Sequence, residues 1–258
     1  MVLTNSYSGR TLVLFDMGGV LLELSYDRFY KESASLSQLS PTLSPEQFKE
    51  KYIQSGIEAE LHAGRITTRD MQREVERIIG RKLVPERFAD LMSKRYVGQI
   101  DETVRLKKKI SGMGYHAGIF SNTTALDKET VSSRFPEMLQ TYDLMAPSVF
   151  SYEVGATKSE TRMEGQTEKR PMYEAVKNIG YAKIILIDDN PQYIDIAVQE
   201  FGWHGILFTQ YADSSEAIKA AGQDTTAPMQ ATHERRRTAG SIDELVSSLA
   251  AFGIRIRQ

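Results

Sequence analysis

The chain of 258 residues contains no cysteine, which excludes disulfide bonds, thiolate nucleophiles and cysteine-based zinc sites. An excess of charge is also absent: 32 Lys and Arg against 34 Asp and Glu give a formal net charge of −2, so no broad basic surface for nucleic acid is indicated. No apolar run reaches membrane-spanning length, and residues 1–10 lack the hydrophobic segment of a signal peptide. We therefore expect a cytoplasmic protein, monomeric or homodimeric, with no nucleic-acid or membrane partner.

A carboxylate stands at the end of a short apolar run near the start of the chain. Residues 11–15 are rich in branched and aromatic side chains and stop at Asp16, which is typical of a buried parallel strand. Gly18 and Gly19 follow and allow a sharp turn that brings backbone N–H groups close to a ligand. Ligands of open α/β sheets bind beyond the carboxyl ends of the strands, so Asp16 is a candidate functional residue. Taken alone, such an aspartate is more often a helix cap or turn residue.

A second apolar run, residues 183–187, also ends in carboxylates, those of Asp188 and Asp189, and Pro191 then opens a predicted helix. If the two strands are neighbours in one parallel sheet, Asp16 lies within a few ångströms of both. Crowded carboxylates repel one another unless a cation lies between them, and their oxygen ligands suit Mg²⁺. A carboxylate neutralised in this way can act as a nucleophile.

Two further signals lie between these strands in the chain. The strand-like run of residues 115–120 ends in Ser121 and Asn122, where a hydroxyl and backbone donors can hold a phosphate oxygen. Another short strand precedes a polar loop that carries Lys158. In isolation a serine at a strand end is common, and a loop lysine is usually a solvated surface charge. Their significance depends on their order relative to the two acidic strand ends.

In this order the segments 15–20, 120–122, 155–158 and 187–190 resemble the four motifs of the haloacid dehalogenase-like (HAD) superfamily. The resemblance extends over residues 11–208 and resumes at 241–253. It implies an α/β fold, with a Rossmann-like, doubly wound parallel sheet as the core. It also implies a site made of the nucleophile Asp16, the phosphate-binding Gly18, Gly19, Ser121, Asn122 and Lys158, and a Mg²⁺ ion held by Asp16, the Gly18 carbonyl, Asp188 and Asp189.

Between the first two motifs lies an insert that we predict to be helical. Residues typical of helix ends divide it into several helices. These residues are Ser44, Pro45, Thr68 and Pro85 at helix starts, Gly80 at a helix end, and Tyr96, which we expect within the last helix. The insert resembles the helical cap of one HAD subclass, a lid that excludes water and selects the substrate. We therefore expect a core of residues 1–24 and 99–258 and a cap of residues 25–98.

Gly18 departs from the family pattern in a way that bears on mechanism. HAD phosphatases usually carry a second aspartate at this position as general acid and base, and such groups contribute roughly 10²–10⁴-fold to the rate. The carbonyl of Gly18 can still bind a metal ion, so only the proton donor is missing. Three explanations stay open: another acid from the cap or the substrate replaces it, the leaving group needs no proton, or activity has been lost.

Two polar insertions also depart from the pattern. We expect residues 159–170 to be flexible, and their Lys169 competes with Lys158 as the phosphate-binding lysine. We favour Lys158, because the preceding segment 153–155 matches the family. The second insertion, residues 210–240, contains a basic run that we expect to be a solvated face. Within it, residues 222–226 are weakly similar to the acid motif of HAD-like terpene cyclases.

Taken together, the sequence predicts a Mg²⁺-dependent phosphatase that acts on a small phosphorylated metabolite through an aspartyl-phosphate on Asp16. Ser121, Asn122 and Lys158 are expected to hold the phosphoryl oxygens. The alternatives are a haloacid dehalogenase-type hydrolase, a binding or regulatory protein without turnover and, with less support, a terpene cyclase. The substrate cannot be predicted, because the cap residues that select it follow no general code.

Overall fold

The core of the molecule is a six-stranded parallel sheet with helices on both faces. The computed structural model describes residues 7, 9–139, 146–211 and 234–256. The strands follow the order β10-β9-β8-β1-β4-β5, and every neighbouring pair is parallel. Their bounds are β1 (Thr11–Phe15), β4 (His116–Ser121), β5 (Val149–Phe150), β8 (Lys183–Asp188), β9 (His204–Phe208) and β10 (Arg236–Ala239).

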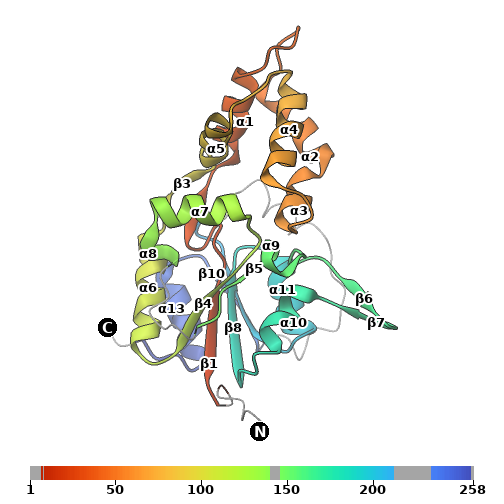
Figure 1. Cartoon of the computed structure of the whole chain (residues 1–258). Helices are drawn as coiled ribbons and strands as arrows, with labels where there is room; N and C mark the ends of the chain where they lie inside the picture. Colours follow the sequence, from red (N-terminus) through yellow and green to blue (C-terminus); the bar gives the residue numbers. More distant parts are fainter. Residues whose placement is uncertain (1–6, 8, 140–145, 212–233, 257–258) are drawn as a thin grey trace.

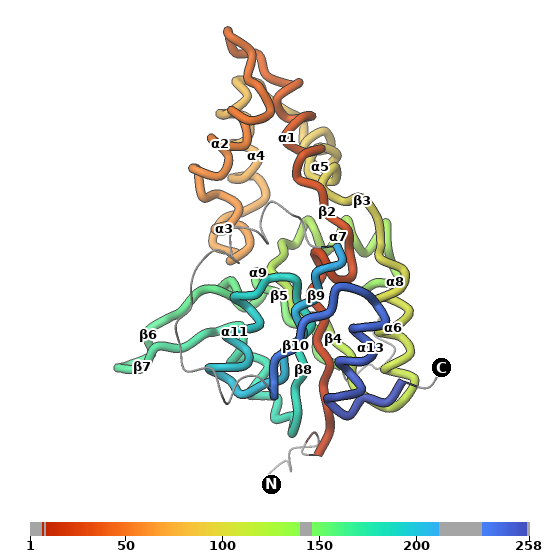
Figure 2. The backbone as a smooth tube through the Cα atoms, turned by 180° about the vertical axis from the view of Figure 1, so that it is seen from behind, coloured from red at the N-terminus to blue at the C-terminus, as the bar shows by residue number. Residues whose placement is uncertain are grey.

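Helices cover the two faces of this sheet, as Figures 1 and 2 show from opposite sides. One face carries α6 (Asp101–Gly112) and α13 (Ile242–Ala251), and the other carries α10 (Pro171–Lys177) and α11 (Pro191–Gln199). Shorter helices join the strands: α7 (Ala125–Arg134), α8 (Pro136–Leu139) and α9 (Ser151–Val154). The predicted doubly wound α/β core is therefore correct, and the helix predicted from Pro191 is α11.

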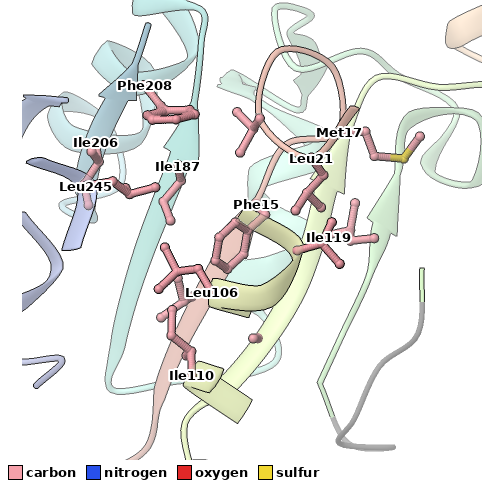
Figure 3. Close-up of a cluster of buried hydrophobic side chains, with 14 of the residues drawn as sticks. Phe15, Met17, Leu21, Leu106, Ile110, Ile119, Ile187, Ile206, Phe208 and Leu245 are labelled. Carbon is pink, nitrogen blue, oxygen red and sulfur yellow. The ribbon is translucent and has the colours of Figure 1, made fainter. Parts of the chain in front are cut away.

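The side chains of β1 show why the apolar runs are continuous. Successive strand residues point to opposite faces, so Leu12 and Leu14 belong to one hydrophobic cluster while Val13 and Phe15 belong to the other. All four are completely buried. On the second face Phe15 packs among side chains of β8, β9, α6 and α13 (Figure 3). A strand buried on both faces needs apolar side chains at every position, not at alternate ones.

The position of β1 within the sheet brings distant segments together. It pairs with β4 on one side and with β8 on the other, so that Phe15 lies opposite Ile119 and Ile187. The residue that follows β1, Asp16, therefore lies between the ends of β4 and β8. The predicted adjacency of the two acidic strand ends is confirmed.

The cap is a helical domain joined to the core by a two-stranded antiparallel ribbon, β2 (Leu22–Leu24) and β3 (Tyr96–Gln99). Aromatic and aliphatic side chains form its own core, with Phe29, Phe48 and Tyr52 in mutual ring contact. Figure 1 shows it above the carboxyl ends of the core strands. Its helices are α1 (Tyr26–Ser35), α2 (Pro45–Ser55), α3 (Ile57–His62), α4 (Thr68–Ile79) and α5 (Pro85–Ser93).

The predicted helix ends of the cap are largely correct. Ser44 caps α2 in a capping box with Gln47, and Gly80 ends α4 with a φ of 67°. The prediction for Tyr96 was wrong, because α5 ends at Ser93 and Tyr96 belongs to β3. The chain must leave the helix there to pair with β2 and re-enter the core.

Both polar insertions contain strands that were not predicted. Residues 159–170 form a hairpin of β6 (Arg162–Glu164) and β7 (Thr167–Lys169) with Gly165 at a φ of 65° in its turn, so the expectation of a flexible segment was wrong. Part of the basic run is β10, which pairs with β9 at the sheet edge and is thus more than a solvated face. Residues 222–226 lie outside the described residues. In the part of the chain that the structure describes, no helix is both long and apolar enough to cross a membrane.

Candidate active site

Asp16 lies in a tight turn immediately after β1. Its backbone N–H donates to the carbonyl of Ile187 at 2.9 Å. The turn then closes through hydrogen bonds from the N–H groups of Leu21 and Leu22 to the carbonyl of Met17. Gly19 adopts a φ of 69°, and a Cβ atom there would lie 2.2 Å from Oδ2 of Asp189. Only glycine satisfies both requirements, so this turn is shaped to fit the second acidic strand end.

Asp16, Asp188 and Asp189 form a cluster in which one carboxylate oxygen of each lies within 4.8 Å of the others. Asp16 is 9% exposed and Asp188 is completely buried. Burial raises the pKa of Asp188 and of Asp189 above the usual range, and the negative charge of Asp16 raises both further. The cluster thus resists carrying three negative charges unless a cation balances them.

Lys158 supplies one positive charge beside these carboxylates. Its Nζ lies 2.9 Å from Oδ1 of Asp16 and 2.6 Å from Oδ2 of Asp188, and its side chain is 1% exposed. The rings of Phe120 and Tyr193 cover the ammonium group, with centroids 5.2 and 5.1 Å away. Burial alone lowers the pKa of Lys158, but Asp16 and then Asp188 raise it overall above its usual value. Lys158 is therefore a charged group that contacts the candidate nucleophile.

The donor set fits a divalent cation. Three carboxylates against one ammonium leave two negative charges uncompensated in a buried cluster. The buried Oδ1 of Asp16 contacts the Lys158 ammonium at 2.9 Å and has no other polar partner among the described residues. Asp188 has both oxygens engaged, one by Lys158 and the other by the backbone N–H of Asn190 at 2.9 Å, whereas Asp189 lines the adjacent cavity. Hard carboxylate oxygens in this number suit Mg²⁺.

Ser121 and Asn122 end β4 beside Asp16, and both line the cavity. The hydroxyl of Ser121 is 3.4 Å from the Asn122 carbonyl, the long limit of a hydrogen bond, so it can turn to a ligand. The Asn122 amide is engaged at both ends: it accepts from the Lys158 backbone N–H at 2.9 Å and donates to the Tyr193 hydroxyl at 3.1 Å. Its side chain therefore holds the lysine loop in place, and only its backbone N–H remains for a phosphate.

Lys169 lies elsewhere. It is on the exposed hairpin strand β7 and pairs with Glu164 at 2.5 Å. The structure thus brings Lys158, and not Lys169, to Asp16. The predicted site residues that it brings together at one edge of the sheet are Asp16, Gly18, Gly19, Ser121, Asn122, Lys158, Asp188 and Asp189.

A cavity of about 530 Å³ opens over this edge, and residues of both the core and the cap line it. The core contributes the acidic cluster and the end of β4. The β2–β3 ribbon contributes apolar and aromatic side chains. The cap side of the wall includes Tyr26, Tyr52, Ile53, Glu58, Ala59 and His62.

Arg95 is a residue of this cavity that the sequence did not reveal. It is 3% exposed and donates to Glu58 of α3 at 2.9 Å and to Asp127 of α7 at 2.6 Å. The hydroxyl of Tyr96 also donates to Asp127. Cap and core are thus joined by a buried ion-pair network. The two partners of each of these hydrogen bonds lie more than 30 residues apart in the chain, so no local pattern could have indicated the network.

No family model and no curated protein sequence matches the chain. Solved structures do match. A HAD family enzyme from Bacteroides thetaiotaomicron, solved as the wild-type protein in complex with magnesium and inorganic phosphate, is 19% identical, with a TM-score of 0.61 over 84% of this chain and 97% of the other. The chain has the HAD fold.

Two further HAD structures extend the likeness. A predicted HAD-like family hydrolase from Porphyromonas gingivalis is 21% identical, with a TM-score of 0.54 over 76% of this chain and 89% of the other. An L-2-haloacid dehalogenase from Xanthobacter autotrophicus, with chloropropionic acid covalently bound, is 12% identical, with a TM-score of 0.51 over 92% of this chain and 96% of the other. At such identities the likeness establishes the HAD fold with its helical cap, as the motifs predicted, and the chemistry must be argued from the site.

Proposed function

We propose that this protein is a hydrolase of the HAD type, and specifically a Mg²⁺-dependent phosphatase that acts on a small phosphate ester. The observation that carries the proposal is the buried contact of Asp16 with Lys158, flanked by Asp188 and Asp189 at the carboxyl edge of the sheet, beside a cavity lined by core and cap. A carboxylate nucleophile, a fixed cation and spare anionic ligands for a metal are the groups that phosphoryl transfer requires.

Each group has a distinct role in the proposed reaction. A carboxylate oxygen of Asp16 attacks phosphorus and displaces the alcohol, and water then hydrolyses the resulting aspartyl-phosphate. Lys158 and Ser121 hold the transferring oxygens, and Asn122 keeps the Lys158 loop in position. Mg²⁺, held by Asp16, the Gly18 carbonyl, Asp188 and Asp189, would neutralise the charge of the cluster and of the phosphoryl group.

The comparison with the Bacteroides enzyme supports this proposal, because that protein was solved with magnesium and inorganic phosphate. The chain shares its fold along nearly the whole length of that protein. In this chain the acidic cluster offers ligands for magnesium, and Lys158 and Ser121 offer donors for phosphate.

Dehalogenation is the second candidate, since haloacid dehalogenases share the fold. The dehalogenase reaction gives no role to the carboxylate pair of Asp188 and Asp189, whereas a metal-dependent phosphatase needs such ligands. This pair favours the phosphatase.

A panel of small phosphate esters, assayed with Mg²⁺ and with EDTA, tests the proposal. We expect phosphate release that requires Mg²⁺. Metal-independent release of chloride from 2-chloropropionate would support the dehalogenase instead. If neither reaction occurs but Mg²⁺ still binds, the protein is a HAD-fold binding protein without turnover, and the proposal is wrong.

A further inference from the structure

The space beside Gly18 is filled by an apolar side chain. A Cβ atom on Gly18 would lie 2.8 Å from Cδ1 of Leu24, which comes from β2. The place where a side chain of residue 18 would begin is thus packed with hydrocarbon and offers no proton donor. A phosphatase built on this turn has to receive the proton for its leaving alcohol from another direction.

Most other titratable side chains of the described cavity wall are engaged by other groups or are poor proton donors. Asp16 and Asp189 belong to the acidic cluster. Glu58 and Asp127 both accept hydrogen bonds from Arg95, so their carboxylates are already engaged. Burial raises the pKa of Tyr26, Tyr52 and Tyr96, so these phenols are poor acids at neutral pH.

His62 is different. It is the last residue of α3 and lines the cavity, and among the described residues it has no hydrogen-bond or ion-pair partner. An imidazole ring has two nitrogens that can donate or accept a proton, which makes it suited to act as acid and base within one reaction cycle.

The end of α3 contacts the core beside the loop that carries Lys158. A Cβ atom on Gly64 would lie 2.5 Å from the carbonyl oxygen of Tyr152, so the backbones of cap and core are in contact there. The next residue, Arg65, donates to both oxygens of Glu160, at 2.7 and 3.0 Å. Glu160 follows Lys158 by two residues in the same loop. His62, three residues before Arg65, is therefore held over the lysine loop and faces the cavity.

We propose that His62 is the general acid and base that Gly18 lacks; this inference rests on the proposed phosphatase function. As the bond between phosphorus and the leaving oxygen breaks, the imidazolium of His62 transfers its proton to that oxygen, and the alcohol leaves neutral. The neutral imidazole then accepts a proton from the water that attacks phosphorus, and the bond from phosphorus to Asp16 breaks. The imidazolium and the free carboxylate are restored, so protons and charges balance over the cycle.

Leaving-group dependence tests this role. The His62→Gln variant is compared with wild type on p-nitrophenyl phosphate, whose leaving group departs as an anion, and on the alkyl phosphate that wild type hydrolyses fastest. We expect kcat for the alkyl ester to fall roughly 10²-fold while kcat for the aryl ester changes little. His62→Asn serves as a second variant, and thermal melts verify folding. The matched control is His204→Gln, the same substitution on β9, where His204 packs on Phe252 outside the cavity.

The outcomes distinguish failure of the His62 role from failure of the proposed phosphatase function. Equal losses on both esters would mean that His62 only shapes the cavity, and unchanged alkyl turnover would mean that the proton comes from elsewhere; either result overturns the role of His62 and leaves the phosphatase intact. Wild-type turnover of aryl but not of alkyl esters would also overturn it, because no donor would then be present. Absence of turnover on every ester would overturn both.

Discussion

Asp188 and Asp189 are neighbours in the chain with different tasks. Asp188 is completely buried and has both oxygens engaged, by Lys158 and by the N–H of Asn190, whereas Asp189 faces Gly19 and the cavity. Successive residues at a strand end point in different directions, which gives two adjacent carboxylates these separate positions. For the proposed Mg²⁺ site, Asp189 is thus the more accessible carboxylate, and Asp188 contacts the lysine.

The Asp189→Ala variant should therefore lose more Mg²⁺ affinity than Asp188→Ala. We expect a loss of roughly 100-fold or more for Asp189→Ala and roughly 10-fold for Asp188→Ala, which acts mainly by disturbing Lys158. Isothermal titration with Mg²⁺ measures both. The reverse order of affinities would show that Asp188 is the principal ligand.

The Gly19→Ala variant should weaken both folding and metal binding. Its positive φ disfavours alanine, and the new methyl group would meet Oδ2 of Asp189 at 2.2 Å. We expect a loss of roughly 1–3 kcal/mol in the free energy of unfolding, with weaker Mg²⁺ binding. Gly114→Ala is the matched control, since Gly114 has a φ of 86° but open space around it. Equal effects of the two variants on Mg²⁺ binding would contradict the contact with Asp189.

The residues of the site differ in how far the sequence could predict them. Asp16, Ser121 and Asp188 were predictable, because each closes an apolar strand and the parallel sheet then aligns their ends. Arg95 and His62 were not, because their relation to the site depends on how the cap packs on the core. A local pattern holds no information about such a contact.

At the scale of helices and strands, Glu76 holds together the end of α4 and the connection to α5. It is 7% exposed and accepts hydrogen bonds from the N–H of Leu83, from Lys82 and from Gln72. Burial alone raises the pKa of Glu76, but these partners, Leu83 first, lower it overall to about 2. Because folding lowers the pKa of Glu76, its ionised carboxylate stabilises the folded cap at pH values above the ordinary pKa of 4.5. That contribution disappears as the pH falls toward 2.

Glu76→Gln should lower the free energy of unfolding at pH 7 by roughly 1–3 kcal/mol. The difference between wild type and variant should narrow as the pH falls from about 4.5 toward 2. Urea unfolding at several pH values measures both effects. Glu74→Gln is the control, since Glu74 pairs with the exposed Arg77 one helical turn along and should matter little. A difference that does not change with pH would mean that the charge of Glu76 is unimportant.

The helix ends of the cap were predictable and several strands were not. Ser44 and Gly80 act on their own helix ends, so their effect is local in sequence. Tyr96 and Arg236–Ala239 became strands because partners far along the chain, β2 and β9, were available to pair with them. A strand that forms only because a distant segment pairs with it cannot be predicted from the pattern of neighbouring residues.

For the whole molecule, the cap meets the core through the buried contacts of Arg95 and the surface ion pair of Arg65 with Glu160. Residues of both domains line the cavity, so a substitution in either domain can change its shape.

Mg²⁺ should raise the thermal stability of the whole protein. The ion would relieve the repulsion within the acidic cluster, and a ligand that binds only the folded state adds about 2.7 kcal/mol at 100 times its dissociation constant. Thermal melts with and without Mg²⁺ measure the shift, with Asp189→Ala as the control. A melting temperature that is independent of Mg²⁺ would contradict a metal site at this cluster.

The role of Asp16 as nucleophile is the central claim, and turnover by Asp16→Asn tests it most directly. The amide keeps the shape of the side chain but cannot attack phosphorus, so a folded Asp16→Asn protein should release no phosphate from any ester that wild type hydrolyses with Mg²⁺. Thermal melts of both proteins verify that the variant is folded. Phosphate release by Asp16→Asn at a rate close to that of wild type would contradict the claim.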